Sequence, residues 1–434
     1  MSARVLDFRA MFPIFEHGTS EYDEALRALS RRGEADLEAV EPQVRAILQA
    51  VRTRGDAAVR ELTERFDKRA VQEVVLPESL WRARALEVVP EVRAALSAAA
   101  ERVERYHVHQ RDPGFRYEED GVTLGLRVRP CKAAGVYAPG GKARYPSSVL
   151  MAAIPAKVAG VPRIVLATPN PTPEICCAAV LSGVTEVLDV GGAQAIAALA
   201  YGTETVRSVD KIVGPGNIFV ACAKRLVFGV VDIDGIAGPS EILVVADDQA
   251  DPRVVAADLL SQAEHDEDAY ALLVTLSRAQ AEAVAREVEA QLRTLSRSAI
   301  AEASVRRHAQ AFVVHDLTEA ARVADLLAAE HLSLQVREPE ALLEHIGAAG
   351  AAFLGDFTPE AAGDYAAGPS HVLPTGGAAR FGGPLGVYDF VVRTSLIRYT
   401  PEAIRAQADL LETLAHLEGL DGHARAVAIR RSSR

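Results

Sequence analysis

Short apolar, β-branched segments alternate with alanine-rich segments from residue 128 onward, and this alternation constrains the fold more than any other feature of the sequence. The first series predicts strands at residues 135–137, 163–167, 186–190 and 211–213, with helices at 148–159, 174–181 and 193–201. The second series predicts strands at 241–245, 271–275, 311–314 and 332–336, with helices at 251–265, 279–296, 317–330 and 339–348. Strand, helix and strand at this spacing are typical of βαβ units, which form parallel sheets covered by helices. We therefore predict two α/β lobes.

The segments outside these two series differ in character. In residues 20–110 apolar positions recur at intervals of three and four, as around 44–51, which predicts helices. A stretch rich in glycine and proline, residues 363–386, interrupts the alternation. The last fifty residues are predicted to be mostly helical.

Composition and charge exclude several classes of protein. The 434 residues have a formal net charge of −12, which would repel phosphate backbones, so we expect no nucleic-acid partner. Residues 1–17 lack the apolar core of a signal peptide, and prolines and charges interrupt the most apolar stretch, 149–168, so we expect no membrane segment. The 4 cysteines show no CxxC spacing, which excludes a disulfide scaffold and a cysteine-based zinc knuckle. We expect a soluble, cytoplasmic protein.

Three glycine-rich turns, at residues 138–141, 190–193 and 213–217, each follow a predicted strand of the first lobe. Glycine lets backbone N–H groups approach a ligand, and a following helix offers its positive end to phosphate. None of the three is GxGxxG, so the usual dinucleotide fingerprint is absent. Each turn alone is typical of a plain βα connection, whereas three in one lobe favour a nucleotide or phosphate cleft.

Two polar pairs stand out in the second lobe. Gln262 and His265 are three apart at the end of a predicted helix, so they project from one face and could share a metal ion. A solvated helix end rich in charge explains the same residues. Glu330 and His331 offer two bases of different strength at a junction between helix and strand. A polar helix terminus is the alternative interpretation of this pair.

Further candidates lie near the carboxyl terminus. Asp364 and His371 are seven apart on the glycine- and proline-rich stretch, which suits a binding loop on a rigid scaffold, although a connecting turn is the alternative. Glu418 and His423, taken by themselves, are explained as surface residues of a helix.

Ten short motifs, in the same order along the chain, closely resemble histidinol dehydrogenases. They are YAPGG at 137–141, PSSVLM at 146–151, GGAQAI at 191–196, VGPGN at 213–217, AGPSE at 237–241, QAEHD at 262–266, EHL at 330–332, GDY at 363–365, HVLPT at 371–375, and EGL at 418–420 with His423. At one position the chain departs from many members of this family, because Ser370 stands before His371 where asparagine is expected.

The resemblance implies two incomplete, Rossmann-like parallel-sheet lobes of the aldehyde-dehydrogenase type, with helical segments at both ends. On this basis we expect an N-terminal arm at 1–24 and an NAD-cleft domain at 131–239. A discontinuous domain at 25–130 and 240–384 would hold the metal and acid–base residues. The expected C-terminal segment, 385–434, is helical and contacts a partner subunit.

The resemblance also implies an NAD- and zinc-dependent oxidation of L-histidinol to L-histidine through histidinaldehyde, the last step of histidine biosynthesis. Four electrons are removed, so two NAD are reduced per turnover. The implied enzyme is a homodimer with one Zn2+ per subunit and with shared active sites, because Glu418 and His423 would reach into the partner's site.

The resemblance assigns roles to single residues. The implied zinc ligands are Gln262, His265, Asp364 and His423, and these four would also touch the substrate. The implied acid–base pair is Glu330 and His331, which also contact substrate. The other implied substrate contacts are Ser240, His371 and Glu418, and the implied NAD contacts are Tyr137, Gln194 and Asn217.

Other activities remain open from the residues. The same scaffold could oxidise another amino alcohol or a sulfonated diol with NAD. The glutamine, histidine and aspartate set could instead serve a zinc hydrolase in which Glu330 activates water. A non-catalytic binding protein would not need Glu330 and His331.

Overall fold

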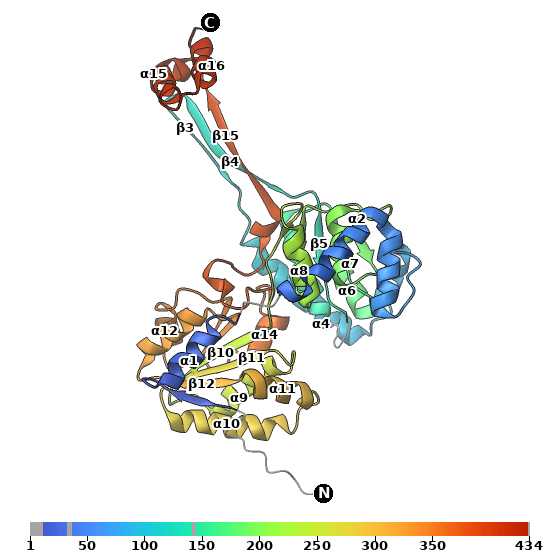
Figure 1. The fold of residues 1–434 in the computed structure, drawn as a ribbon, viewed down its shortest axis with the longest axis vertical. Helices are drawn as coiled ribbons and strands as arrows, with labels where there is room; N and C mark the ends of the chain where they lie inside the picture. The colour runs from blue at the N-terminus through green and yellow to red at the C-terminus, as the bar shows by residue number, and fades with distance from the viewer. Residues whose placement is uncertain (1–11, 33–36, 141–144, 433–434) are drawn as a thin grey trace.

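The structure is a computed structural model that describes residues 12–32, 37–140 and 145–432. Two α/β lobes lie side by side, and an arm that ends in the carboxyl-terminal helices projects away from them (Figure 1). The prediction of two lobes with parallel sheets is confirmed. Within the described ranges, no helix combines the length and the apolar character needed to cross a bilayer.

The first lobe is built on a six-stranded sheet with the strand order β2-β7-β6-β5-β8-β9. The strands are β2 (Val75–Leu76), β5 (Ala134–Tyr137), β6 (Ile164–Ala167), β7 (Glu186–Leu188), β8 (Lys211–Val213) and β9 (Asp232–Ile233). The helices that follow them are α5 (Pro146–Ala159), α6 (Pro173–Leu181), α7 (Gly192–Tyr201) and α8 (Ile218–Val227). All pairings are parallel except that of β2 with β7. Every residue of β5 and β6 is buried, because helices cover both faces of the sheet.

The second lobe is built on a fully parallel sheet with the order β1-β12-β11-β10-β13-β14. The strands are β1 (Ile14–Glu16), β10 (Glu241–Ala246), β11 (Tyr270–Thr275), β12 (Gln310–Val313), β13 (His331–Gln335) and β14 (Ala351–Leu354). The helices are α1 (Ser20–Leu29), α9 (Pro252–Ala263), α10 (Arg278–Leu292), α11 (Ser298–His308), α12 (Leu317–Leu327), α13 (Pro339–Leu343) and α14 (Glu360–Tyr365).

The helical region after residue 36 packs on the first lobe, which corrects the expected grouping of residues 25–130 with 240–384. It forms α2 (Leu37–Asp67), α3 (Glu78–Ala85) and α4 (Pro90–Val108). Val44 and Val59 share a core with Leu188 of β7, and Trp81 shares another with Val136 of β5. The apolar spacing of a helix shows that it has a buried face but not which sheet that face covers.

The amino-terminal segment also differs from the expected arm at 1–24, of which residues 1–11 lie outside the described ranges. Strand β1 pairs with β12, and Tyr22 and Leu26 of α1 are buried in the core of the second lobe. These residues are therefore an integral part of that lobe.

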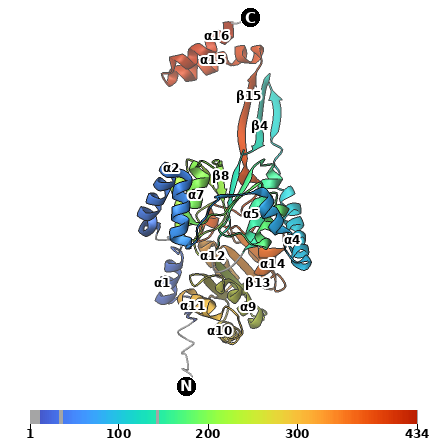
Figure 2. The same cartoon turned by 90° about the vertical axis from the view of Figure 1, so that its right-hand side faces the viewer.

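The projecting arm is a three-stranded antiparallel sheet with two helices at its far end (Figures 1 and 2). Its elements are β3 (Phe115–Glu119), β4 (Val122–Pro130), β15 (Val391–Tyr399), α15 (Pro401–Leu417) and α16 (Asp421–Ser432). The expectation that 385–434 is helical is therefore correct for α15 and α16 but wrong for β15. Strand β15 pairs along its whole length with β4, which is distant in sequence, so no local pattern shows the pairing.

Candidate active site

The site of the second lobe lies at the amino ends of two neighbouring strands. Strand β10 begins at Glu241 and β13 begins at His331, and their register pairs Ile242 with His331. This pairing brings Glu241 beside Glu330 and His331. Ligands of open α/β sheets more often bind at the carboxyl ends of the strands. The candidate site of the second lobe differs from this pattern, because it lies at the amino ends of β10 and β13.

Glu330 and His331 are buried, with exposed fractions of 6% and 4%. The Glu330 carboxylate accepts a hydrogen bond from the Glu241 N–H at 2.9 Å. Nδ1 of His331 lies 3.1 Å from the Glu241 carbonyl oxygen, 3.7 Å from Glu330 Oε2 and 3.6 Å from Glu360 Oε1. Because all three neighbours are acceptors, we assign the imidazole proton to Nδ1, which leaves Nε2 as the basic atom.

Burial shifts these two groups in opposite directions. Loss of solvation raises the pKa of Glu330 well above its usual range, and the carboxylates of Glu241, Glu360 and Asp364 raise it further. Loss of solvation lowers the pKa of His331 to about 4. The imidazole is therefore neutral at neutral pH, and the Glu330 carboxylate is a stronger base than an exposed glutamate.

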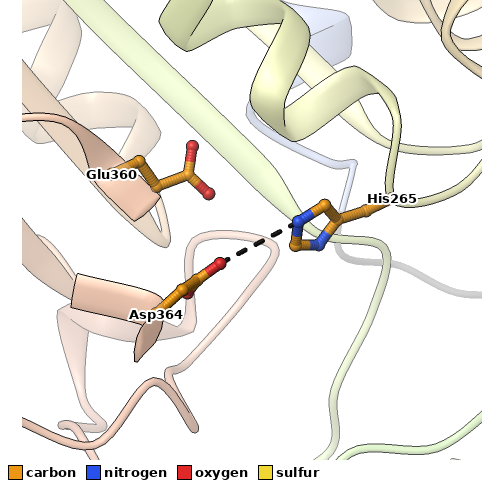
Figure 3. A group of neighbouring side chains, drawn as sticks. All are labelled: His265, Glu360 and Asp364. Carbon is orange, nitrogen blue, oxygen red and sulfur yellow. Dashed lines mark ion pairs between the residues drawn. The ribbon is translucent and has the colours of Figure 1, made fainter. Parts of the chain in front are cut away.

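His265, Glu360 and Asp364 turn their side chains toward a common space (Figure 3). One ligand atom from each lies within 4.8 Å of the others, and His265 Nε2 is 3.9 Å from Asp364 Oδ2. Glu360 was not predicted from the sequence. It stands four residues before Asp364, on one face of α14, and this spacing is a signal that could have identified it.

The residues present fit a metal ion of the zinc type. Gln262 is 0% exposed, and neither atom of its side-chain amide has a hydrogen-bond partner among the described residues. Glu360 Oε1 is also buried and accepts no hydrogen bond from the described residues, although it lies 3.6 Å from His331 Nδ1. A buried polar atom without a partner costs free energy, which a bound cation would offset. Imidazole nitrogen and carboxylate or amide oxygen are donors that suit Zn2+ at an open site.

His371 links this cluster to the first lobe. Its Nδ1 lies 3.0 Å from the Asp364 carbonyl oxygen, and its Nε2 lies 3.3 Å from Oγ of Ser148 in α5. Ser370 is buried and donates to the Met151 carbonyl at 3.1 Å, so it holds the loop against α5. Ser240 is half-buried immediately before Glu241, which places it at the same strand edge.

The three residues expected along the NAD cleft lie near the carboxyl ends of the first lobe's strands. Tyr137 ends β5, and its hydroxyl accepts from the Gly192 N–H at 3.0 Å. Gln194 is buried in the first turn of α7. Asn217 is exposed and caps α8 by accepting from the N–H groups of Phe219 and Val220.

Glycines in these glycine-rich turns allow the backbone to pack closely against neighbouring segments. Gly214 has φ +112°, and a Cβ there would lie 2.1 Å from the Tyr137 carbonyl oxygen. A Cβ on Gly140 would lie 2.4 Å from the Pro169 ring. The Gly214 N–H already donates to Asp234 at 2.7 Å. These glycines are therefore required by close backbone packing, whether or not a phosphate binds beside them.

Glu418 and His423 are not brought to the other predicted site residues. Both are exposed at the far end of the arm, where they line an apolar groove between α15 and α16 with Leu411, Leu414 and Leu420. Figure 1 shows this end of the arm remote from both lobes.

Comparisons with known proteins give one consistent family. The family model described as histidinol dehydrogenase matches residues 30–431. The histidinol dehydrogenase of Aquifex aeolicus is 50% identical over 412 residues, covering 94% of this chain and 97% of the relative. That of Cereibacter sphaeroides is 52% identical over 413 residues, covering 94% of each chain. A crystal structure of histidinol dehydrogenase from Elizabethkingia anophelis has a TM-score of 0.91 and 34% identity, covering 97% of this chain and 98% of that chain.

Proposed function

The chain belongs to the histidinol dehydrogenase family, and from this premise we propose that it oxidises L-histidinol to L-histidine with NAD, the last step of histidine biosynthesis. Family membership makes the chain an oxidoreductase, which favours this reaction over the zinc hydrolysis considered from the sequence. The observation that supports the proposal most is the buried pair Glu330 and His331, which contacts Glu360 of the candidate metal-binding cluster.

The overall reaction fixes what the site must do. Converting a primary alcohol to a carboxylate removes four electrons, consumes one water molecule and releases three protons. NAD, when bound, accepts two electrons as hydride, so two NAD are needed and histidinaldehyde must be retained between the two stages. Water must add to the aldehyde before the second hydride leaves. The site therefore needs one base for the alcohol and one for water.

The two residues divide these tasks. His331 is neutral because burial lowers its pKa to about 4, so Nε2 accepts the proton of the alcohol. Glu330 has a raised pKa, which makes its carboxylate a suitable base for the water that attacks the aldehyde. We propose that Ser240, His371 and Glu418 also contact the substrate.

The proposed metal is Zn2+, one per subunit, held by Gln262, His265 and Asp364 with His423. Zn2+, when bound, would orient the substrate through its amine and imidazole, which are both good donors. The buried, unpartnered amide of Gln262 supports this assignment. Glu360 lies in the same cluster and is a further candidate ligand.

We further infer a homodimer in which a second copy of the chain supplies Glu418 and His423. In one chain both residues lie at the end of the arm, away from the lobes. The arm helices expose large apolar side chains, including Leu414, Leu417 and Ile429, which a second copy would cover. NAD would bind along Tyr137, Gln194 and Asn217, and the proposed use of NAD is consistent with a cytoplasmic location.

The stoichiometry of the reaction tests the proposal. We expect two NADH for each L-histidinol consumed and loss of activity on chelation, with recovery on adding Zn2+. L-Phenylalaninol is a matched control that keeps the amino alcohol but lacks the imidazole, and we expect it to be a poor substrate. One NADH per substrate with release of free aldehyde would overturn the four-electron reaction. Equal rates with both alcohols would overturn the substrate assignment.

A further inference from the structure

An ion pair between Arg32 and Glu241 lies next to the proposed acid–base pair. The side chain of Arg32 is 2% exposed and that of Glu241 is 1% exposed. Arg32 follows α1, and Glu241 begins β10. The guanidinium binds the carboxylate with two hydrogen bonds, from Nε to Oε2 at 2.5 Å and from Nη2 to Oε1 at 2.8 Å. A two-point contact of this kind fixes the orientation of a carboxylate as well as its position.

Glu241 and Glu330 hold each other through reciprocal hydrogen bonds. The N–H of Glu241 donates to Oε2 of Glu330 at 2.9 Å, and the N–H of Glu330 donates to Oε1 of Glu241 at 3.1 Å. Both N–H groups lie at the amino edge of neighbouring parallel strands and are buried, so each requires an acceptor. The position of the Glu330 carboxylate is therefore set by Glu241.

The same ion pair fixes three further parts of the site. Oε1 of Glu241 also accepts from the Gly376 N–H at 3.0 Å, in the loop that follows His371. Arg32 donates from Nη2 to the Leu327 carbonyl at 2.6 Å, at the end of the helix that leads to Glu330. The Glu241 carbonyl lies 3.1 Å from Nδ1 of His331.

Charge explains why an arginine stands at this point. Glu241, Glu330 and Glu360 are all buried, and carboxylates so close together repel one another strongly where water is excluded. The guanidinium of arginine is cationic, so Arg32 supplies a compensating charge at this point. A lysine would keep the charge but not the two-point contact.

We propose that Arg32 and Glu241 are positioning residues for the reaction, holding the Glu330 carboxylate where it takes a proton from water. The kinetic part of this inference rests on the proposed function. Arg32 touches the reacting groups only through Glu241 and the backbone, so its removal should affect the chemical step and not substrate affinity.

The test combines Arg32→Met with Glu330→Gln. Because a small displacement of a reacting group is costly, we expect Arg32→Met to lower kcat by about 100-fold and to change KM by less than about threefold. In the Glu330→Gln background the same substitution should lower kcat by less than about twofold, since the residue it positions is already disabled. Arg163→Met is the matched control. Arg163 binds Glu186 with two hydrogen bonds and donates to two carbonyls in the first lobe, far from this edge, so its kcat should stay near wild type.

Three results would overturn the proposal: no loss of kcat in Arg32→Met, an equal loss in both backgrounds, or an equal loss in Arg163→Met. If Arg32→Met does not fold, Glu241→Gln takes its place. The glutamine keeps a side-chain oxygen that can accept from the N–H groups of Glu330 and Gly376, but it replaces the carboxylate that Arg32 binds with a neutral amide. If the wild-type protein leaves L-histidinol unoxidised, the proposed function fails. The positioning pair is then judged by hydrogen exchange of peptides spanning Glu241 and Glu330. Faster exchange in Arg32→Met but not in Arg163→Met supports it, and unchanged exchange overturns it.

Discussion

Glu330 and His331 are adjacent in sequence, yet their properties depend on residues that lie far away in the chain. Nδ1 of His331 faces the Glu241 carbonyl and the Glu360 carboxylate, which together hold its proton on that nitrogen. Glu330 is held by the Glu241 N–H. The dipeptide thus becomes an acid–base pair only when strands β10 and β13 lie side by side.

Substituting Glu330 should separate the two halves of the reaction. We expect Glu330→Gln to slow oxidation of histidinaldehyde about 100-fold or more, because the amide cannot take a proton from water. Oxidation of L-histidinol to the aldehyde should slow less, since His331 accepts that proton. Single-turnover formation of NADH from each substrate measures the two rates. Glu289→Gln, at a partly exposed position on α10, is the control, and equal losses in both halves would remove Glu330 from the water-activating role.

Asp258 gives a prediction about stability and pH. Its carboxylate is buried and accepts from Gln335 Nε2 at 2.8 Å, and burial raises its pKa from 3.8 to about 6. Since the raised value favours the protonated form in the folded state, this group lowers stability progressively as pH rises from about 4 to about 6. Asp258→Asn keeps an acceptor for Gln335 and removes that loss, so it should stabilise the chain at pH 7.5 by at most about 3 kcal/mol.

Urea unfolding of the chelator-treated protein at pH 4, 5 and 7.5 measures this effect. The difference between Asp258→Asn and wild type should be small at pH 4, larger at pH 5 and largest at pH 7.5. Asp248→Asn, an exposed position just after β10, should show no such trend. A difference that is equal at all three pH values would contradict the raised pKa.

Among the elements, those whose burial follows a local period were predictable and those defined by distant partners were not. The βαβ alternation predicted the four central strands of each lobe's sheet, β5 to β8 and β10 to β13, because strands covered on two faces are continuously apolar, whereas the edge strands β1, β2, β9 and β14 were not predicted. Strand β15 escaped prediction since seven of its nine residues are exposed and its partner β4 is remote in sequence. Helices α2 and α3 pack on the first lobe. Their apolar periodicity shows that each helix has a buried face, but it does not show which of the two sheets that face covers. Motif order selected His265 and Asp364, which the structure brings together with Glu360, and the spacing of four between Glu360 and Asp364 was the one local signal for Glu360.

The arm can be weakened at one glycine without touching the lobes. Gly125 lies in β4, and a Cβ there would lie 2.6 Å from the Phe115 carbonyl oxygen of β3. We expect Gly125→Ala to destabilise the arm by about 1–3 kcal/mol and to lower activity, because the arm bears Glu418 and His423. Hydrogen exchange should accelerate in β3, β4 and β15 but not in the sheets of the lobes. Gly235→Ala is the control, since apart from its chain neighbours no atom of the described residues lies within 4 Å of the added Cβ. Unchanged exchange in the arm would refute this.

In the molecule as a whole, one chain holds only part of the site that we propose. His265, Glu360 and Asp364 face one another in the second lobe (Figure 3), beside the loop in which His371 reaches Ser148 of the first lobe, while Glu418 and His423 belong to the helical end of an extended arm (Figure 1). An arm of this kind exposes apolar side chains on its helices and has little contact with the rest of its own chain. Both features are explained if a second copy completes the site.

Mixing two inactive variants tests this arrangement directly. In a dimer with exchanged arms, a Glu330→Gln chain lends an intact His423 to the site of a His423→Ala chain, and that site then has every proposed residue. Random reassembly of equal amounts should give half heterodimers with one working site each, or about one quarter of wild-type activity. Without exchange, each chain keeps its own defect and mixing restores nothing. The control mixes Glu330→Gln with His331→Ala, whose defects lie in the same lobe, so neither arrangement yields a site free of substitutions. Recovery in the first mixture alone would therefore show that His423 acts in the other subunit, and no recovery in a mixture proven to exchange subunits would refute it.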